Sequence, residues 1–68
     1  MEKLRTWRQS VGLSAEEAGR LIGVSNVQWG RIENGVRQVA ADKVLEVERV
    51  TGISRHELRP DIFGERAA

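Results

Sequence analysis

The sequence contains no cysteine and only one histidine, His56. This excludes a disulfide framework and leaves too few thiolates and imidazoles for a zinc site of the usual kinds. No nucleophile stands beside a credible acid–base pair, so we expect neither enzymatic activity nor a cofactor. The sequence also has no apolar run of about 18 residues and no apolar segment of a signal peptide near its start, and we therefore expect a cytoplasmic protein without a membrane partner.

The chain also lacks a large excess of either positive or negative charge. The chain has 68 residues, 40% apolar and 31% charged, a balance typical of one compact domain and not of a disordered segment. Its net charge is only +1, small for a protein that binds nucleic acid. Residues 1–39 carry six basic and four acidic side chains, whereas residues 40–68 carry five basic and six acidic ones. We therefore expect a polyanion to meet the N-terminal half.

Glycine and serine divide the chain into short helices. Four glycines follow stretches with helical apolar spacing, and glycine readily adopts the left-handed conformation that closes many helices: Gly12, Gly23, Gly35 and Gly52. Residues 14–17, 25–28 and 54–57 fit the capping box, in which a serine and a Glu or Gln satisfy each other's backbone donors. The predicted helices cover residues 2–11, 15–22, 26–34 and 41–51, with a short fifth helix after Ser54 that ends before Pro60. Residues 61–68 are predicted to form an extended tail.

Apolar spacing within these helices identifies the core. The inward stripes are Leu4, Trp7 and Val11 on the first helix, Trp29 and Ile32 on the third, and Val44, Val47, Val50 and Thr51 on the fourth. Leu45 lies off its stripe. Both tryptophans are therefore expected in the core and not as stacking platforms for single-stranded nucleic acid.

The second and third predicted helices are joined by only three residues, 23–25, and the turn opens on a glycine. Two helices joined in this way are typical of a helix-turn-helix. The pair needs small residues where the helices touch, which Ala18 and Gly19 supply. Their small volume also leaves room for Trp29, which is larger than this position usually holds.

Residues 13–35, LSAEEAGRLIGVSNVQWGRIENG, carry a specific likeness to a known family. Here the chain resembles the Cro/CI-type, lambda-repressor-like regulators of phages and bacteria, and the likeness continues from residue 39 to residue 60. The resemblance implies an all-α, compact five-helix DNA-binding domain in residues 1–60, with the helix-turn-helix as helices two and three. It also implies an ion pair between Arg8 and Glu33. Ala15 departs from the family, which usually has a phosphate-binding Gln there, and residues 39–41 lack the usual loop proline and helix cap.

The exposed face of the third helix is the predicted reader of DNA, because Trp29 and Ile32 point inward and the start of this helix meets base edges in the motif. The candidate base contacts are Asn26, Val27, Gln28, Gly30 and Arg31. The candidate phosphate contacts, at the starts of helices two and three, at the end of the third helix and in the loop after it, are Ser14, Ala15, Ser25, Asn34 and Arg37.

Each candidate base contact has its own chemistry. Arg31 can donate two hydrogen bonds to guanine, and Asn26 or Gln28 can pair with adenine. Gln28 has an alternative role, since it can simply close the capping box with Ser25. Val27 can pack on a thymine methyl group. Gly30 costs on the order of 1 kcal/mol relative to alanine in mid-helix, and we expect that it lets the helix approach DNA closely.

These observations predict a sequence-specific regulator of transcription, a Cro-like repressor that binds a palindromic double-stranded operator as a homodimer and needs no small-molecule effector. The candidate dimer residues are Leu45, Ile62 and Phe63. Ile62 and Phe63 have an alternative role, in which they fold back over helices one and five. The alternative function is an antitoxin-like or scaffold module that uses the same fold to bind a protein, favoured by the small net charge and by Ala15.

Overall fold

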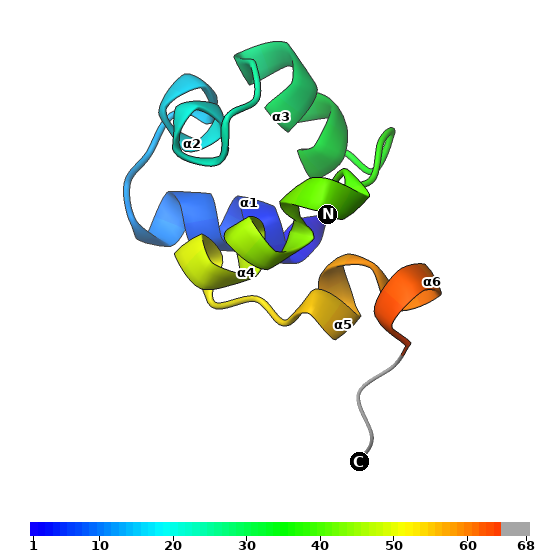
Figure 1. Ribbon diagram of the computed structural model, residues 1–68. Helices are drawn as coiled ribbons and strands as arrows, with labels where there is room; N and C mark the ends of the chain where they lie inside the picture. Colours follow the sequence, from blue (N-terminus) through cyan, green and yellow to red (C-terminus); the bar gives the residue numbers. More distant parts are fainter. Residues whose placement is uncertain (65–68) are drawn as a thin grey trace.

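The computed structural model describes residues 1–64 and is all-α over that range, as predicted (Figure 1). Its elements are α1 (Glu2–Ser10), α2 (Ala15–Ile22), α3 (Asn26–Glu33), the 3-10 turn η1 (Ala41–Lys43), α4 (Val44–Thr51), α5 (Arg55–Leu58) and α6 (Pro60–Phe63). The described part thus holds six α-helices where five were predicted. None of its helices is long and apolar enough to cross a lipid bilayer.

The helix-turn-helix unit is bounded by local hydrogen bonds. Ser14 Oγ accepts from the Glu17 N–H at 3.1 Å, and the Ser14 N–H donates to the Glu17 carboxylate at 3.0 Å, so the first predicted capping box is confirmed. Gly23 ends α2 with a φ of 75°, a left-handed conformation that glycine adopts without strain. At the start of α3 Ser25 Oγ accepts from the Gln28 N–H at 3.1 Å, while the reciprocal bond from the Gln28 side chain does not form within residues 1–64. The second box is therefore half formed.

Several predictions outside this unit were wrong. The third capping box does not form, because Ser54 Oγ accepts from the His56 N–H and the Glu57 carboxylate pairs with Lys3. Residues 61–63 are helical and not extended, since a proline at the first position of a helix lacks only an amide that would have no helical partner anyway. The remainder of the predicted tail, residues 65–68, lies outside the described residues.

Two helix boundaries also shift. The segment predicted as one helix from residue 41 starts as the 3-10 turn η1 and becomes α-helical at Val44, with no side-chain cap at either start. Helix α1 ends at Ser10, so Val11 lies beyond it and is half exposed, outside the core that the apolar spacing placed it in.

The core lies where α1, α2, α3 and α4 meet, and α5 closes one end of it (Figure 1). The buried apolar residues are Leu4, Ala18, Ile22, Trp29, Ile32, Val39, Val44, Val47 and Leu58. The Trp29 ring is completely buried, and its centroid lies 6.1 Å from that of Trp7. A Cβ atom built on Gly19 would lie 2.7 Å from the Val24 carbonyl oxygen, which is why α2 and α3 can approach so closely only with a glycine there.

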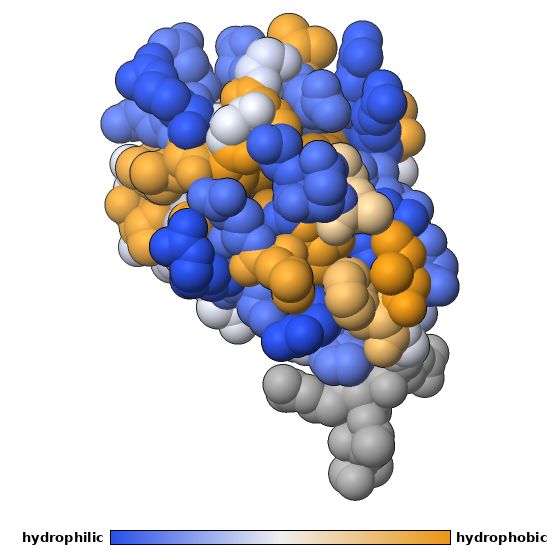
Figure 2. Space-filling model, in the orientation of Figure 1, coloured by the Kyte–Doolittle hydropathy of each residue, from blue (hydrophilic) through white to orange (hydrophobic). Residues whose placement is uncertain are grey.

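Apolar and polar side chains are unevenly distributed on the surface. Figure 2 shows polar side chains over much of α2 and α3 and a gathering of apolar ones lower down, near α6. Ile62 on α6 is 47% exposed and Leu45 on α4 is 54% exposed. Phe63, in contrast, is half-buried and packs against the core.

Candidate nucleic-acid interface

Helix α3 presents one buried and one exposed face. Trp29 and Ile32 are almost fully buried, which fixes the inner face against the core. On the opposite side, Asn26, Val27 and Arg31 are exposed and Gly30 is half-buried among them; these four residues form a surface that we call the reading face, with Gln28 half-buried at its margin. The structure therefore brings the five candidate base contacts together on one side of one helix.

A buried carboxylate holds α3 to α1. The Glu33 carboxylate accepts hydrogen bonds from Arg8 Nε and Nη2, both at 2.9 Å, from Arg5 Nε at 3.1 Å and from Trp29 Nε1. These four residues are called the Glu33 cluster below. The Arg8 hydrogen bonds, with smaller contributions from Trp29 and Arg5, lower the pKa of Glu33 to about 2 although burial acts in the opposite direction.

The ion pair that the family resemblance implies is thus present, and Arg5 enlarges it. Arg5 Nη2 also donates to Asn34 Oδ1 at 2.7 Å, so the Asn34 side chain, a candidate phosphate contact, already has one partner within the chain. Reasoning from the sequence missed Arg5 because its carboxylate partner lies 28 residues away. A sequence signal was present in the spacing, since Arg5 and Arg8 stand at i and i+3 on one side of α1.

Basic side chains without a carboxylate partner are concentrated in one segment. Arg66 lies outside the described residues, and seven of the other lysines and arginines form ion pairs: Lys3, Arg5, Arg8, Arg20, Arg49, Arg55 and Arg59. Within residues 1–64 the three that form none are Arg31, Arg37 and Lys43. They belong to α3, to the loop after it and to η1. Although the net charge of the chain is only +1, the basic side chains without a carboxylate partner in residues 1–64 therefore lie on or near α3.

Lys43 adds a cation that the sequence analysis did not assign. A Cβ atom built on Gly23 would lie 3.0 Å from Lys43 Nζ, so this ammonium group sits beside the turn between α2 and α3. The turn also contains Ser25, the N-cap of α3. Only the fold reveals this approach, because Lys43 lies 20 positions beyond the turn in the sequence.

The other candidate phosphate contacts lie at the starts of α2 and α3. Ser14 and Ser25 are exposed, and each hydroxyl oxygen accepts a backbone N–H, which leaves its hydrogen free to donate outward. Ala15 is the first residue of α2, where backbone N–H groups have no helical partner. Arg37 is exposed in the loop after α3, and the N–H groups of Val36 and Arg37 both donate to the Arg31 carbonyl oxygen, which folds this loop back on the helix.

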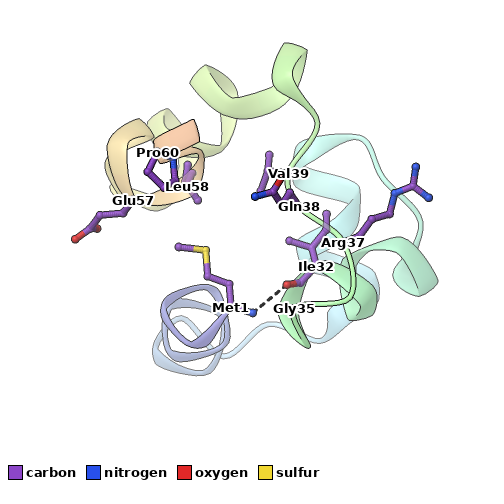
Figure 3. A pocket seen from close by; sticks show the side chains of 9 residues that line it. All are labelled: Met1, Ile32, Gly35, Arg37, Gln38, Val39, Glu57, Leu58 and Pro60. Atoms are coloured by element: carbon purple, nitrogen blue, oxygen red, sulfur yellow. Dashed lines mark hydrogen bonds between the residues drawn. The ribbon is translucent and has the colours of Figure 1, made fainter. Parts of the chain in front are cut away.

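A small cavity of about 210 Å³ lies behind this loop, lined by Met1, Ile32, Leu58, Pro60 and neighbouring residues (Figure 3). Its wall is mostly apolar. The Met1 ammonium group donates to the Ile32 carbonyl oxygen at 2.9 Å, and the Arg37 side chain extends away from the cavity. The cavity therefore lies apart from the reading face.

Comparison with known proteins gives one match. A family model described as a helix-turn-helix domain matches residues 2–60, which span α1 to α5 and the first residue of α6. No curated protein and no solved structure matches the chain. The match therefore includes the reading face, the Glu33 cluster and the three cations beside α3.

Proposed function

The chain belongs to the helix-turn-helix domain family, a DNA-binding class, and on this premise we propose that it is a sequence-specific regulator of transcription. More closely, it acts as a Cro-like repressor that reads a palindromic operator through the major groove as a dimer. The observation that carries the proposal is the reading face itself. It is exposed, it includes an arginine without a carboxylate partner, and it lies on a helix whose other face is held by the core.

Base recognition follows from side-chain chemistry. Arg31 donates two hydrogen bonds to guanine O6 and N7, the commonest specific contact in the major groove. Asn26 and Gln28 supply amide groups that pair with adenine N6 and N7. The capping alternative for Gln28 loses weight, since its backbone N–H and not its side chain bonds to Ser25.

Phosphate contacts place the helix in the groove. The starts of α2 and α3, with Ser14, Ala15 and Ser25, offer backbone N–H groups and hydroxyls to one strand. Lys43 stands beside the turn between these helices, and Arg37 and Asn34 follow the end of α3. These cations near the turn before α3 and in the loop after it fit a helix that lies close to the phosphate chains.

A dimer supplies what one copy lacks. Three cations without partners make few phosphate contacts, and affinity for DNA depends steeply on their number. Half-sites in this motif lie about 34 Å apart, and the longest extent of the molecule is 33 Å, so two copies can occupy adjacent half-sites without overlapping. Leu45 and Ile62 are the exposed apolar side chains proposed for the contact between the two copies, whereas Phe63 packs against the core of its own chain.

The test is selection of duplexes from a randomised pool by the wild type and by Arg31→Ala, followed by sequencing. We expect a palindromic consensus from the wild type, with a guanine preference that Arg31→Ala weakens by about 1–3 kcal/mol. Arg49→Ala is the matched control, because Arg49 is an exposed arginine paired with Glu46 on α4, and it should retain the wild-type consensus. Weak, salt-sensitive and sequence-blind retention that Arg31→Ala leaves unchanged would contradict the proposal.

A second candidate function is a protein-interaction module of the antitoxin or scaffold kind. The apolar side chains near α6 and the pairing of seven basic groups favour it. It predicts that Leu45→Ser and Ile62→Ser abolish binding to a protein partner, while Arg31→Ala alters nothing that is measured on DNA.

A further inference from the structure

Gly30 is a glycine that the fold does not require. Five glycines of the described range adopt a positive φ, and Gly30 is not among them. Gly19 is helical too, but the backbone of the turn occupies the space that a side chain at Gly19 would need. A Cβ atom on Gly30, in contrast, would meet nothing within 4 Å. Alanine at position 30 would raise the equilibrium constant for folding about fivefold. The reason for a glycine therefore lies outside the chain, on the side that the reading face presents.

The neighbours of Gly30 define the chemistry of this notch. Val27 lies one turn earlier on the same face and is 57% exposed, so its methyl groups form one wall. The Gly30 carbonyl oxygen already accepts from the Asn34 N–H at 2.9 Å. The notch thus offers C–H groups and no free hydrogen-bonding group, and the next residue along α3 is the exposed Arg31.

We infer that the notch formed by Val27 and Gly30 receives the C5-methyl group of a thymine, on the base pair next to the guanine that Arg31 reads. Among the four bases, thymine is the one that presents a methyl group in the major groove beside its O4 acceptor, whereas the other three present only donors or acceptors, which would find no partner in the notch. The missing side chain lets the helix come close enough for methyl contact. The inference rests on the proposed function and deepens it by specifying a thymine beside a guanine in each half-site.

The experiment uses the duplex selected by the wild-type protein, with each thymine replaced in turn by deoxyuridine, which removes only the methyl group. We expect one thymine per half-site, next to the selected guanine, at which the replacement weakens binding about fourfold, the value of one buried methyl group. The other thymines of the same duplex serve as internal controls and should change binding less than twofold.

Two variants connect this effect to the notch. Gly30→Ala fills the notch, so it should bind the thymine duplex about tenfold more weakly than the wild type and bind the thymine and uracil duplexes equally. Val27→Ala removes a wall and should reduce the preference for thymine without adding bulk. Thermal unfolding of Gly30→Ala should show a raised melting temperature, which separates weaker binding from a damaged fold.

The outcomes distinguish this inference from the function on which it rests. The thymine inference would be overturned if no thymine of the selected consensus were sensitive to replacement by deoxyuridine, or if Gly30→Ala kept the preference for thymine. Either result would leave the repressor proposal standing. A destabilised Gly30→Ala would overturn it as well, because the glycine would then serve the fold. Absence of any consensus from the wild type would remove both proposals together.

Discussion

The inner and outer faces of α3 differ in how much of their chemistry is satisfied within the chain. On the inner face, Glu33 accepts hydrogen bonds from three side chains, and no buried side-chain polar atom in residues 1–64 lacks a partner. On the outer face, Arg31 has no carboxylate partner and Gly30 faces open space. The comparison teaches that the residues that position this helix are separate from the residues available to bind, so substitutions on the outer face can alter binding without destabilising the fold.

The largest expected effect comes from breaking the inner face with Glu33→Gln. The substitution removes the charge that Arg5 and Arg8 share, and we expect the free energy of unfolding to fall by about 2–4 kcal/mol, slightly below the range for a fully buried pair because both arginines are partly exposed. Urea denaturation measures it. Glu16→Gln is the control, since Glu16 pairs with Arg20 on the surface and should cost less than about 0.5 kcal/mol. Equal losses from the two variants would contradict the buried role of Glu33.

Protonation of Glu33 at low pH should destabilise the protein as Glu33→Gln does, because it removes the same negative charge. The pKa of Glu33 is about 2 in the folded protein and about 4.3 in the unfolded chain, so the unfolded state binds the proton first as pH falls. The stabilisation from Glu33 is complete above about pH 5. As the pH falls to about 2, the free energy of unfolding decreases by about 3 kcal/mol through the loss of this stabilisation. Glu17, whose pKa is lowered by the Ser14 backbone N–H, acts in the same direction.

The measurement is urea denaturation at several pH values for the wild type and for Glu33→Gln. The variant should have a shallower dependence on pH, because it lacks the group with the largest shift. Parallel curves for the two proteins would show that other carboxylates carry the acid sensitivity.

Smaller effects are expected when the same change, glycine to alanine, is made once beside the inner face and once on the outer face. Gly19→Ala places a methyl group against the Val24 backbone and should destabilise the protein by about 1–3 kcal/mol, since the backbone of the turn must shift. Gly30→Ala meets open space and should stabilise it by up to about 1 kcal/mol. Thermal unfolding of both variants checks the signs, and two changes of the same sign would refute the distinction.

The smallest effect on folding should come from Arg31→Ala on the outer face. Because the Arg31 side chain is exposed and forms no ion pair with the rest of residues 1–64, its removal should change the free energy of unfolding by less than about 0.5 kcal/mol. Urea denaturation, run beside the duplex selection, measures this. A loss above 1 kcal/mol would mean that Arg31 also supports the fold.

The helix-turn-helix was predictable from the sequence because its boundaries depend on near neighbours. Ser14 and Glu17 are three residues apart, and Gly23 needs only its own freedom of φ to end α2. The inward position of Trp29 follows from helical spacing alone. The reading face was predictable for the same reason, since it is the side opposite the buried one.

What the sequence did not reveal depends on distant partners. Glu57 fits a capping box with Ser54, yet it pairs with Lys3, 54 residues away. Pro60 excludes a helix that continues through it but permits one that begins there, and the choice depends on Phe63 packing against a core assembled from other helices. Lys43 reaches the turn at Gly23 only because η1 and α4 fold back onto α2.

The Glu33 cluster has a consequence for the thermodynamics of association. Because Arg5 and Arg8 of α1 hold Glu33 at the end of α3, this helix is already oriented before any partner arrives, and complex formation carries little entropic cost for orienting it. Loosening the cluster would then weaken the proposed recognition through entropy, although no side chain of the reading face itself has been changed. The selectivity proposed for α3 would thus depend on a carboxylate that is buried behind the reading face.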